Sequence, residues 1–563
     1  MAKPNAAASI APLRPPAQVM RLARLGASFP TRLSFMRSLL RRLSCEKAQV
    51  SRPVWQIDDQ GFGQAVYSVD LGGYTYSLVA FSTPLSDDDR TDRVIAEAWD
   101  TTYVLFDGTP TAADLKRLAA NAPKQEAGRF SDKELVLCRA NKSVRMFQHV
   151  VECLAAGHQP SPQQVQDVGY LMRTTAVYGN GKFGIADRAR FADRPGMSGP
   201  FHAEMLAVWL VRGFTHDLVE HVARTLAPLT FTPLDPGLKR HLGIGNATGL
   251  GMAPFLVNHP ILLNNWILAR ETALARVLGL TAMSRVKVAR VTKLIDRVTR
   301  HLNQWNVADR RQLDRVLVLR QEWSKVAKLA TEGWLSKAHP WTRLVELADS
   351  RSVEFQELMV ALVLEVNGDL IDDLADGMSA SGQGRFNTAM TVGEMRKVLA
   401  KHFDWALGID FAQPDSQRLF WYVSEEKAEP RLGDRYAEAG ADIETRLDIA
   451  RQAQDFANSL DTVPDNVSIA EFLTHHPQHR SIARRAQSAS AYPYAELRDN
   501  LIAADCMPID MLRCKLAFFG AAKFDPKSDR WTRITMYQGA PLFGEISGGG
   551  GDDWWLPVLA GAG

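Results

Sequence analysis

Two spacings of apolar residues follow one another along the chain. Between residues 53 and 107, β-branched and aromatic residues are concentrated in short runs, and the pair Gly72-Gly73 separates two of them. This pattern predicts strands over 54–57, 65–71, 74–81 and 101–106, in a small antiparallel sheet with a hairpin at the two glycines. From residue 111 onwards apolar residues recur at helical spacing, which predicts helices for most of the remaining chain.

The expected helices are 111–121, 132–156, 161–177, 200–227, 262–279, 284–304, 308–330, 341–376, 391–406, 442–459, 478–490 and 494–519, with short strands at 418–424 and 530–537. A short amphipathic helix is also expected over 31–43. The predicted fold class is therefore mostly α-helical, of the α+β kind, with a small N-terminal antiparallel sheet followed by a large multi-helix domain. No run of about 18 apolar residues occurs, so no membrane span is predicted.

Length and composition divide the chain further. At 563 residues the chain exceeds the size of one core. We expect a basic N-terminal arm with a short amphipathic helix (1–50), a small antiparallel β-containing region (51–130), a helical core with the candidate site (131–376), a C-terminal helical region (385–543) and a Gly/Asp-rich tail (544–563). The five cysteines include no Cys-x-x-Cys pair, which favours a reducing compartment and a cytoplasmic protein.

The N-terminal arm carries most of the charge imbalance. Nine lysines and arginines against Glu46 give residues 1–50 a charge of +8, so the rest of the +3 chain carries −5. Three interpretations fit this imbalance. The arm packs on the acidic body or on a sister subunit, it contacts a surface or nucleic acid, or it is a targeting segment of the Arg-rich, acid-poor kind.

The segment 243–266 is the richest in residues that have special backbone or polar roles. Glycines between 243 and 251 let the backbone approach a ligand closely, and amides and an imidazole are set into the apolar run that follows. Buried polar groups need partners, which an internal network or a bound molecule would supply. His259 is a candidate for proton transfer. The candidate substrate-binding residues are Asn246, Thr248, Gly249, Asn258 and Asn264.

A second glycine cluster, 178–184, lies between two expected helices. Backbone N–H groups and the Lys182 ammonium would converge there on a phosphate or carboxylate. The candidate anion-binding residues are Gly179, Asn180, Gly181 and Lys182. This cluster lacks the spacing of a Walker A loop, and 243–251 lacks that of a dinucleotide fingerprint. A tight turn between helices is the alternative.

The expected helix 200–227 groups polar residues on one face of an otherwise apolar surface. On a helical wheel His202, His216 and Glu220 fall close together. They are interpreted as a general acid–base pair, as metal ligands, or as satisfied core histidines with an ion pair. Further ligands at a known spacing are not visible, so no metal site and no organic cofactor are predicted, with a divalent metal as the alternative.

Two charged segments of opposite sign follow. Fourteen lysines and arginines against five acids mark 267–330, whereas 354–376 is rich in acids. Pairing between the two, or plain solvation, is expected, with phosphate binding by the basic stripe as the alternative. Asp372-Asp-Leu-Ala-Asp376 resembles the Asp-Asp-x-x-Asp box of isoprenoid synthases, an all-helical family whose box binds magnesium and a diphosphate. The resemblance covers five residues, and none extends along the chain.

Basic residues near the C-terminus form another candidate anion site around Phe518-Phe519-Gly520: Arg513, Lys515, Lys523, Arg530 and Arg533. Common hydrolase, zinc-protease and kinase signatures are absent.

Together these features favour a soluble enzyme that acts on a small anionic metabolite by His/Glu acid–base chemistry, of lyase, isomerase or hydrolase type. The alternative is a non-catalytic helical scaffold whose basic arm binds a partner, an anionic membrane or nucleic acid. A homodimer or other homo-oligomer, formed through helices or the arm, is expected from size alone. Nucleic acid is not favoured as a partner, because the chain as a whole is not basic.

Overall fold

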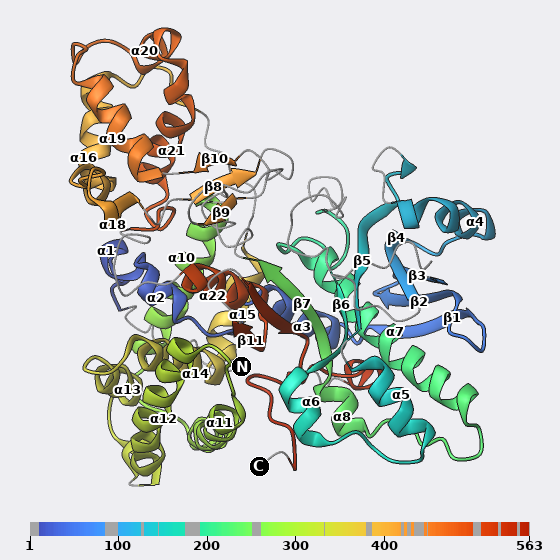
Figure 1. The fold of residues 1–563 in the computed structure, drawn as a ribbon. Helices are drawn as coiled ribbons and strands as arrows, with labels where there is room; N and C mark the ends of the chain where they lie inside the picture. Colours follow the sequence, from blue (N-terminus) through green and yellow to red (C-terminus); the bar gives the residue numbers. More distant parts are fainter. Residues whose placement is uncertain are drawn as a thin grey trace.

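A computed structural model describes most of the chain. The described residues are 11–84, 99–124, 129–144, 146–174, 192–249, 260–331, 333–378, 386–417, 421–424, 430–432, 444–447, 449–498, 508–526, 531–548 and 552–561. Within them the fold is α+β, as the sequence predicts, because antiparallel N-terminal strands are followed by many helices (Figure 1). No helix in these ranges is both long and apolar enough to cross a membrane.

In the described part of the chain, nine strands form one sheet in the order β1-β2-β3-β4-β5-β6-β7-β12-β11. They are β1 (Gln49–Ile57), β2 (Gly63–Leu71), β3 (Tyr74–Pro84), β4 (Trp99–Asp107), β5 (Glu134–Val144), β6 (Tyr170–Thr174), β7 (Gly243–Gly249), β11 (Lys523–Pro526) and β12 (Trp531–Met536). Neighbouring strands are antiparallel, except that β6 and β7 run parallel. The pattern predicts β1–β4, and Gly72 and Gly73 turn the β2–β3 hairpin with φ angles of 62° and 84°.

The central strands differ from the prediction. The pattern predicts one helix over 132–156, whereas the structure has β5 followed by α5 (Phe147–Ala155). The segment 161–177 likewise forms α6 (Pro162–Val168) and then β6, and Gly169 ends the helix with a φ of 78°. The consecutive residues Val136 and Leu137 of β5 are both buried, in different clusters. A continuous apolar run of this kind has no period that distinguishes a buried strand from a buried helix.

Helices cover both faces of the sheet. The 25-residue helix α7 (His202–Leu226) crosses one face and contacts β2 to β7, and α5 packs along it. Helix α4 (Ala112–Asn121) and the 3-10 turn η2 (Ala122–Lys124) cover part of the opposite face, where Leu118 joins Val104 and Phe106 in a separate small core. The short helix α8 (Pro236–His241) leads directly into β7.

The basic arm is described from residue 11 and packs on the acidic body of its own chain. Its helices are α1 (Pro16–Val19), α2 (Leu22–Gly26) and α3 (Phe35–Cys45). The arm's arginines pair with carboxylates distant in sequence, at N···O distances of 2.7–3.3 Å: Arg14–Glu271, Arg24–Glu357, Arg32–Asp372, Arg37–Glu365 and Arg41–Asp372. Of the three interpretations of the arm, this geometry matches the first.

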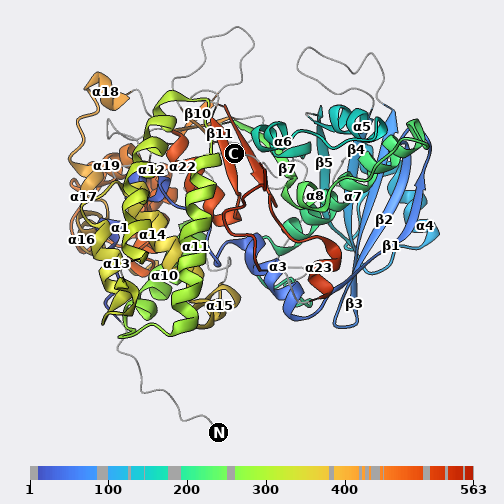
Figure 2. The same ribbon diagram turned by 90° about the horizontal axis from the view of Figure 1, so that it is seen from below.

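A layer of helices lies beside the sheet, as Figure 2 shows. It contains α10 (Pro260–Leu278), α11 (Arg285–Gln304), α12 (Arg310–Thr331), the 3-10 turn η6 (Trp334–Ser336), α13 (Pro340–Ala348), α14 (Val353–Val366), α15 (Gly368–Asp376) and α22 (Pro508–Phe519). The predicted helix 341–376 is thus three helices, and the predicted helix 494–519 begins at Pro508. The basic and acidic segments pair as expected, Arg276 with Asp373 at 2.8 Å and Lys287 with Asp369 at 3.1 Å.

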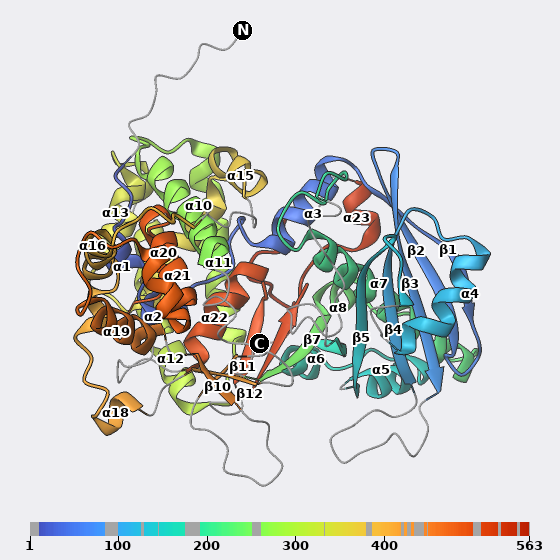
Figure 3. The ribbon, with the colours of Figure 1, turned by 90° about the horizontal axis from the view of Figure 1, so that it is seen from above.

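Residues 386–491 have a hydrophobic core of their own, to which Phe403, Phe456 and Phe472 belong. The helices of this region, seen from above in Figure 3, are α16 (Val392–His402), α17 (Asp404–Leu407), α18 (Pro414–Gln417), α19 (Ile449–Leu460), α20 (Ile469–His475) and α21 (Arg480–Ala491), with the 3-10 turn η7 (Pro477–His479). A small separate sheet has the order β10-β8-β9, formed by β8 (Trp421–Ser424), β9 (Pro430–Leu432) and β10 (Glu444–Leu447).

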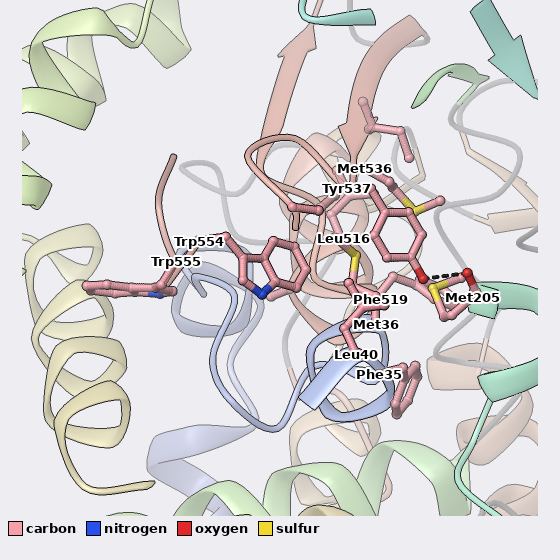
Figure 4. Packing of buried hydrophobic residues seen from close by; sticks show 14 of the residues in the cluster. Phe35, Met36, Leu40, Met205, Leu516, Phe519, Met536, Tyr537, Trp554 and Trp555 are labelled. Carbon is pink, nitrogen blue, oxygen red and sulfur yellow. Dashed lines mark hydrogen bonds between the residues drawn. The ribbon is translucent and has the colours of Figure 1, made fainter. Parts of the chain in front are cut away.

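The C-terminal tail returns to the main core after helix α23 (Phe543–Ser547). Trp554 and Trp555 are buried in the cluster that also holds Met36 of α3 and Phe519 of α22 (Figure 4). Tyr537, directly after β12, lies in the same cluster and donates a hydrogen bond to a carbonyl oxygen of α7. The two ends of the described chain therefore meet around the sheet's last strands.

Candidate functional site

Helix α7 carries three of the predicted catalytic residues and places them in separate surroundings. His202 is buried, with Nδ1 2.8 Å from the Gly196 carbonyl oxygen and Nε2 3.1 Å from the Ser38 hydroxyl. Both ring nitrogens are engaged within the protein, so His202 ties α3 and the preceding loop to α7. His216 lies on the same helix about 21 Å further along its axis. The two histidines share a helix face but not a site.

His216 and Glu220 are one turn apart but have different partners. Burial, followed by the charges of Arg212 and Lys239, lowers the pKa of His216 well below its usual value. His216 is therefore a neutral core histidine, and its Nε2 has no hydrogen-bond partner among the residues described. Glu220 instead accepts a hydrogen bond from the Leu234 N–H at 3.1 Å and pairs with Lys239 at 3.0 Å. No acid–base pair between His216 and Glu220 is formed.

Arg212, one turn before His216, was not singled out by the sequence analysis. Its guanidinium is 2% exposed and all three of its nitrogens donate to carbonyl oxygens. The acceptors, at 2.7–3.2 Å, belong to Lys239, Arg240, Leu242, Ala540 and Pro541. Burial lowers the pKa of Arg212 to about 9. The arginine joins the loop before β7 to the loop after β12; its only sequence signal is a cation within an apolar helix.

The central strands bring distant segments together. β7 pairs with parallel β6 on one side, where Tyr170 lies opposite Gly243, and with antiparallel β12 on the other, where Arg533 lies opposite Ala247. Because β6 and β7 are parallel, their ends at Thr174 and Gly249 lie at the same edge of the sheet. β12 begins at that edge, since Trp531 pairs with Gly249.

The glycines of β7 make this close pairing possible. A Cβ atom on Gly245 would collide with the ring of Tyr170, and one on Gly243 would collide with the Met536 carbonyl oxygen. Only glycine fits where a ring or a backbone approaches so closely. The glycine-rich stretch is therefore a buried strand at 243–249, and the aromatic ring of Tyr170 takes the place of a β7 side chain.

One side of these strands is polar, and we call it the sheet's polar face. The alternation of a strand puts Arg533 and Thr535 of β12 on the same side, together with their partners Asp525 and Lys523 of β11. The ring of Tyr170 covers Gly245, the partner of Thr535, and so belongs to this side as well. The opposite side carries Ile244, Ile534 and Met536, which are buried in the main hydrophobic core.

Donors and acceptors on the polar face do not balance. The Tyr170 residue is 1% exposed, and its hydroxyl lies beside the Arg533 guanidinium, which can only donate. The phenol proton therefore has no acceptor among the described residues, and neither has the Nε–H of Arg533. Burial opposes the charge of Arg533, but the hydrogen bond to Asp525 and the nearby Tyr170 outweigh it, so the pKa of Arg533 is raised.

Lys523 adds a second cation to this face. Its ammonium donates to the Gln166 carbonyl oxygen at 2.8 Å and to that of Asp167 at 3.3 Å, at the C-terminal end of α6. His241 lies nearby, and burial followed by the charge of Lys523 lowers its pKa to about 3. The polar face thus presents the cations Arg533 and Lys523, which suits a ligand that is anionic and accepts hydrogen bonds.

The other predicted binding residues fall in three places. Asn246, Thr248 and Gly249 are in β7, where they pair with Ile534, Thr532 and Trp531. The Asn264 side chain, in α10, accepts the Tyr494 N–H at 3.0 Å and holds residue 494 in place. Outside the described residues lie Gly179, Asn180, Gly181, Lys182, Asn258 and His259.

Two of the three carboxylates of the Asp-Asp-x-x-Asp segment, Asp372 and Asp373, are engaged by arginines. Asp372 accepts two hydrogen bonds from Arg32, both at 2.7 Å, and Asp373 pairs with Arg276. Among the described residues, no three His, Cys, Asp or Glu side chains gather as a metal site. This segment joins the basic arm to the body.

Comparison with known proteins gives no further assignment. No protein-family model matches the chain, and neither a curated protein nor a solved structure matches it significantly.

Proposed function

We propose that this protein is an enzyme that binds a small anionic metabolite, carrying a carboxylate or a phosphate, at the polar face of β6, β7, β12 and β11. The observation that carries the proposal is the pair of buried donors on Tyr170 and Arg533 that have no acceptor in the described ranges. Leaving such groups unpaired costs about 1–3 kcal/mol each, so a bound acceptor would be stabilised by both.

Charge supports an anion rather than a neutral acceptor. Arg533 and Lys523 face one carboxylate, Asp525, which already accepts from Arg533. An anion would complete the hydrogen bonding of the guanidinium, and such charge-assisted bonds are about twice as strong as neutral ones.

The chemistry proposed is proton transfer, of lyase, isomerase or hydrolase type, without an organic cofactor. Tyr170 is the described side chain best placed to give a hydrogen bond or a proton to a ligand on the polar face. His202 and His216 do not serve this role in the proposal, because one is engaged on both nitrogens and the other is distant and buried.

The alternative of a scaffold that binds partners through its basic arm is less well supported. Arg14, Arg32 and Arg37 are engaged by carboxylates of the same chain, so binding of an external polyanion would have to break these pairs. Breaking a buried ion pair costs more free energy than binding a polyanion through a surface arginine that has no partner.

A thermal-shift screen tests the proposal. Wild type, Tyr170→Phe and Tyr103→Phe are compared in phosphate, small carboxylic acids, nucleotides and CoA esters at fixed ionic strength. Tyr103 is a matched control because it is equally buried in the same sheet, and its hydroxyl already donates to Thr101 at 3.0 Å. Saturable stabilisation by one class, kept in Tyr103→Phe and reduced in Tyr170→Phe, is expected.

Turnover of the stabilising compound is then followed by NMR. A ligand that binds through Tyr170 and is not converted would contradict the enzymatic part of the proposal alone. A flat response to every anion class would contradict the binding site itself.

A further inference from the structure

Edge strand β11 separates the polar face from a small cavity on its other side. Lys523 and Asp525 face the polar face, whereas Phe524, between them, lines the cavity. The cavity has a volume of about 30 Å³ and is also lined by Ser28 of the basic arm, His301 and Trp305 at the end of α11, and Arg513 of α22.

Three lining residues carry polar hydrogens without an acceptor. The Ser28 hydroxyl, the Trp305 indole N–H and the Nε–H of Arg513 are buried and have no hydrogen-bond partner within the described part of the chain. The three residues are only 6%, 6% and 4% exposed. An indole and a guanidinium can only donate, so the missing group must be an acceptor.

Arg513 brings a positive charge to the cavity, and its guanidinium also pairs with Glu354 at an N···O distance of 3.3 Å. Arg513 stacks over the Phe524 ring with its charge centre 5.0 Å from the ring centroid. Burial, and after it the charges of Lys523 and Arg297, lowers the pKa of His301 to about 4, although its Nδ1 bonds to the Pro557 carbonyl oxygen.

Size restricts the occupant. The volume exceeds the roughly 10–15 Å³ that one water molecule needs, so the cavity has room for a water-sized particle such as a monatomic anion. From the donor set, the charge and the size we infer that this cavity binds a single halide ion such as chloride, held by Ser28, Trp305 and Arg513. The ion would link the basic arm to α11 and α22, at a place distinct from the polar face.

A water molecule is the competing occupant, because Ser28 and His301 Nε2 could accept its two protons. Anomalous diffraction separates the two. Crystals of the full chain are soaked in sodium bromide, and a bromide peak between Trp305 and Arg513 is expected. An ordered water there, with no anomalous signal, would overturn the inference.

Solution measurements use the Trp305→Phe variant, which removes one N–H and keeps the ring. Melting temperature is followed against sodium bromide, with sodium gluconate keeping the ionic strength constant. The Trp323→Phe variant is the control, because that buried indole already donates to Thr299 at 3.1 Å. We expect a saturable rise in wild type and in the control, and an affinity weakened about tenfold in Trp305→Phe.

Equal bromide responses in all three proteins would contradict the site. If Trp305→Phe does not fold, the Ser28→Ala variant and the diffraction result on wild type still decide whether the cavity binds a halide ion. The halide response should be unchanged in Tyr170→Phe, so that failure of this inference and failure of the proposed function are distinguishable.

Discussion

A buried and a partly buried arginine in this protein have opposite surroundings. Every nitrogen of Arg212 donates to a carbonyl oxygen, and these bonds join the segment before β7 to the segment after β12. Arg533 pairs with Asp525 through one nitrogen, while its Nε–H and the adjacent Tyr170 hydroxyl have no acceptor among the residues that the structure describes. A closed set of hydrogen bonds, in which every donor has an acceptor, stabilises the fold. An open set, in which some donors have none, gains stability when a ligand accepts from them. The contrast separates structural polar residues from candidates for function.

Removing the hydrogen bonds of Arg212 should have the largest effect on stability. The Arg212→Met variant removes the arginine's hydrogen bonds to five carbonyl oxygens, of which that of Pro541 keeps the Trp209 indole N–H. We expect it to lose about 3–5 kcal/mol of unfolding free energy, as when a buried charged group is removed from its partners. Urea unfolding followed by circular dichroism measures the loss. A loss below about 1 kcal/mol would mean that these carbonyls find other donors easily.

Acid should have the next largest effect on stability, through two buried histidines. Burial holds the pKa of His301 near 4 and that of His241 near 3 when folded, below the usual value of 6.5. The unfolded chain therefore binds protons more strongly, so this stability is complete above pH 6.5 and is lost as the pH falls towards 4 and 3. We expect about 2 kcal/mol lost per histidine between pH 7 and pH 5. The slope of urea midpoints against pH should become shallower in His301→Gln; an unchanged slope would contradict the assignment.

A substitution at Gly245 would break the contact between Tyr170 and β7. A methyl group on Gly245 would collide with the Tyr170 ring, so Gly245→Ala should destabilise the protein by about 1–3 kcal/mol and also weaken anion binding. Gly408→Ala is the matched control, since nothing lies within 4 Å of its added methyl group. Equal melting temperatures for the two variants would argue against the packing of β6 on β7.

The smallest expected effect comes from comparing a tyrosine hydroxyl that has an acceptor with one whose proton has none. The Tyr103→Phe variant removes a hydroxyl that has an acceptor and should cost about 1 kcal/mol. Tyr170→Phe removes a hydroxyl whose proton has none, and should change ligand-free stability by less than about 0.5 kcal/mol or raise it slightly. Calorimetric melting of both variants without ligand tests this. The reverse order of stabilities would show that Tyr170 belongs to a closed network.

Much of the fold could be predicted from the sequence, because its elements have local signals. The antiparallel strands before residue 107, their glycine hairpin and most helices follow from periodicity and turn residues. β5 and β6 could not be predicted, because a strand buried on both faces lacks alternation. β7 could not be predicted either, since its glycines and small residues have meaning only when Tyr170 and β12 lie against them.

The candidate site was predictable only in its parts. The glycine-rich segment 243–249 and the cations Lys523 and Arg533 stand out in the sequence, but their pairing joins strands almost 300 residues apart. Tyr170 lay in a segment whose pattern predicts a helix, so it gave no signal. His202 and His216 appeared to share a site because a helical wheel ignores distance along the axis.

The binding affinity of the stabilising anion, measured by titration calorimetry on wild type, Tyr170→Phe and Tyr103→Phe, tests the central claim most directly. We expect an affinity about tenfold weaker in Tyr170→Phe and unchanged in Tyr103→Phe, because one charge-assisted hydrogen bond is lost only in the first. Equal affinities in all three proteins would show that the anion binds elsewhere and would contradict the claim.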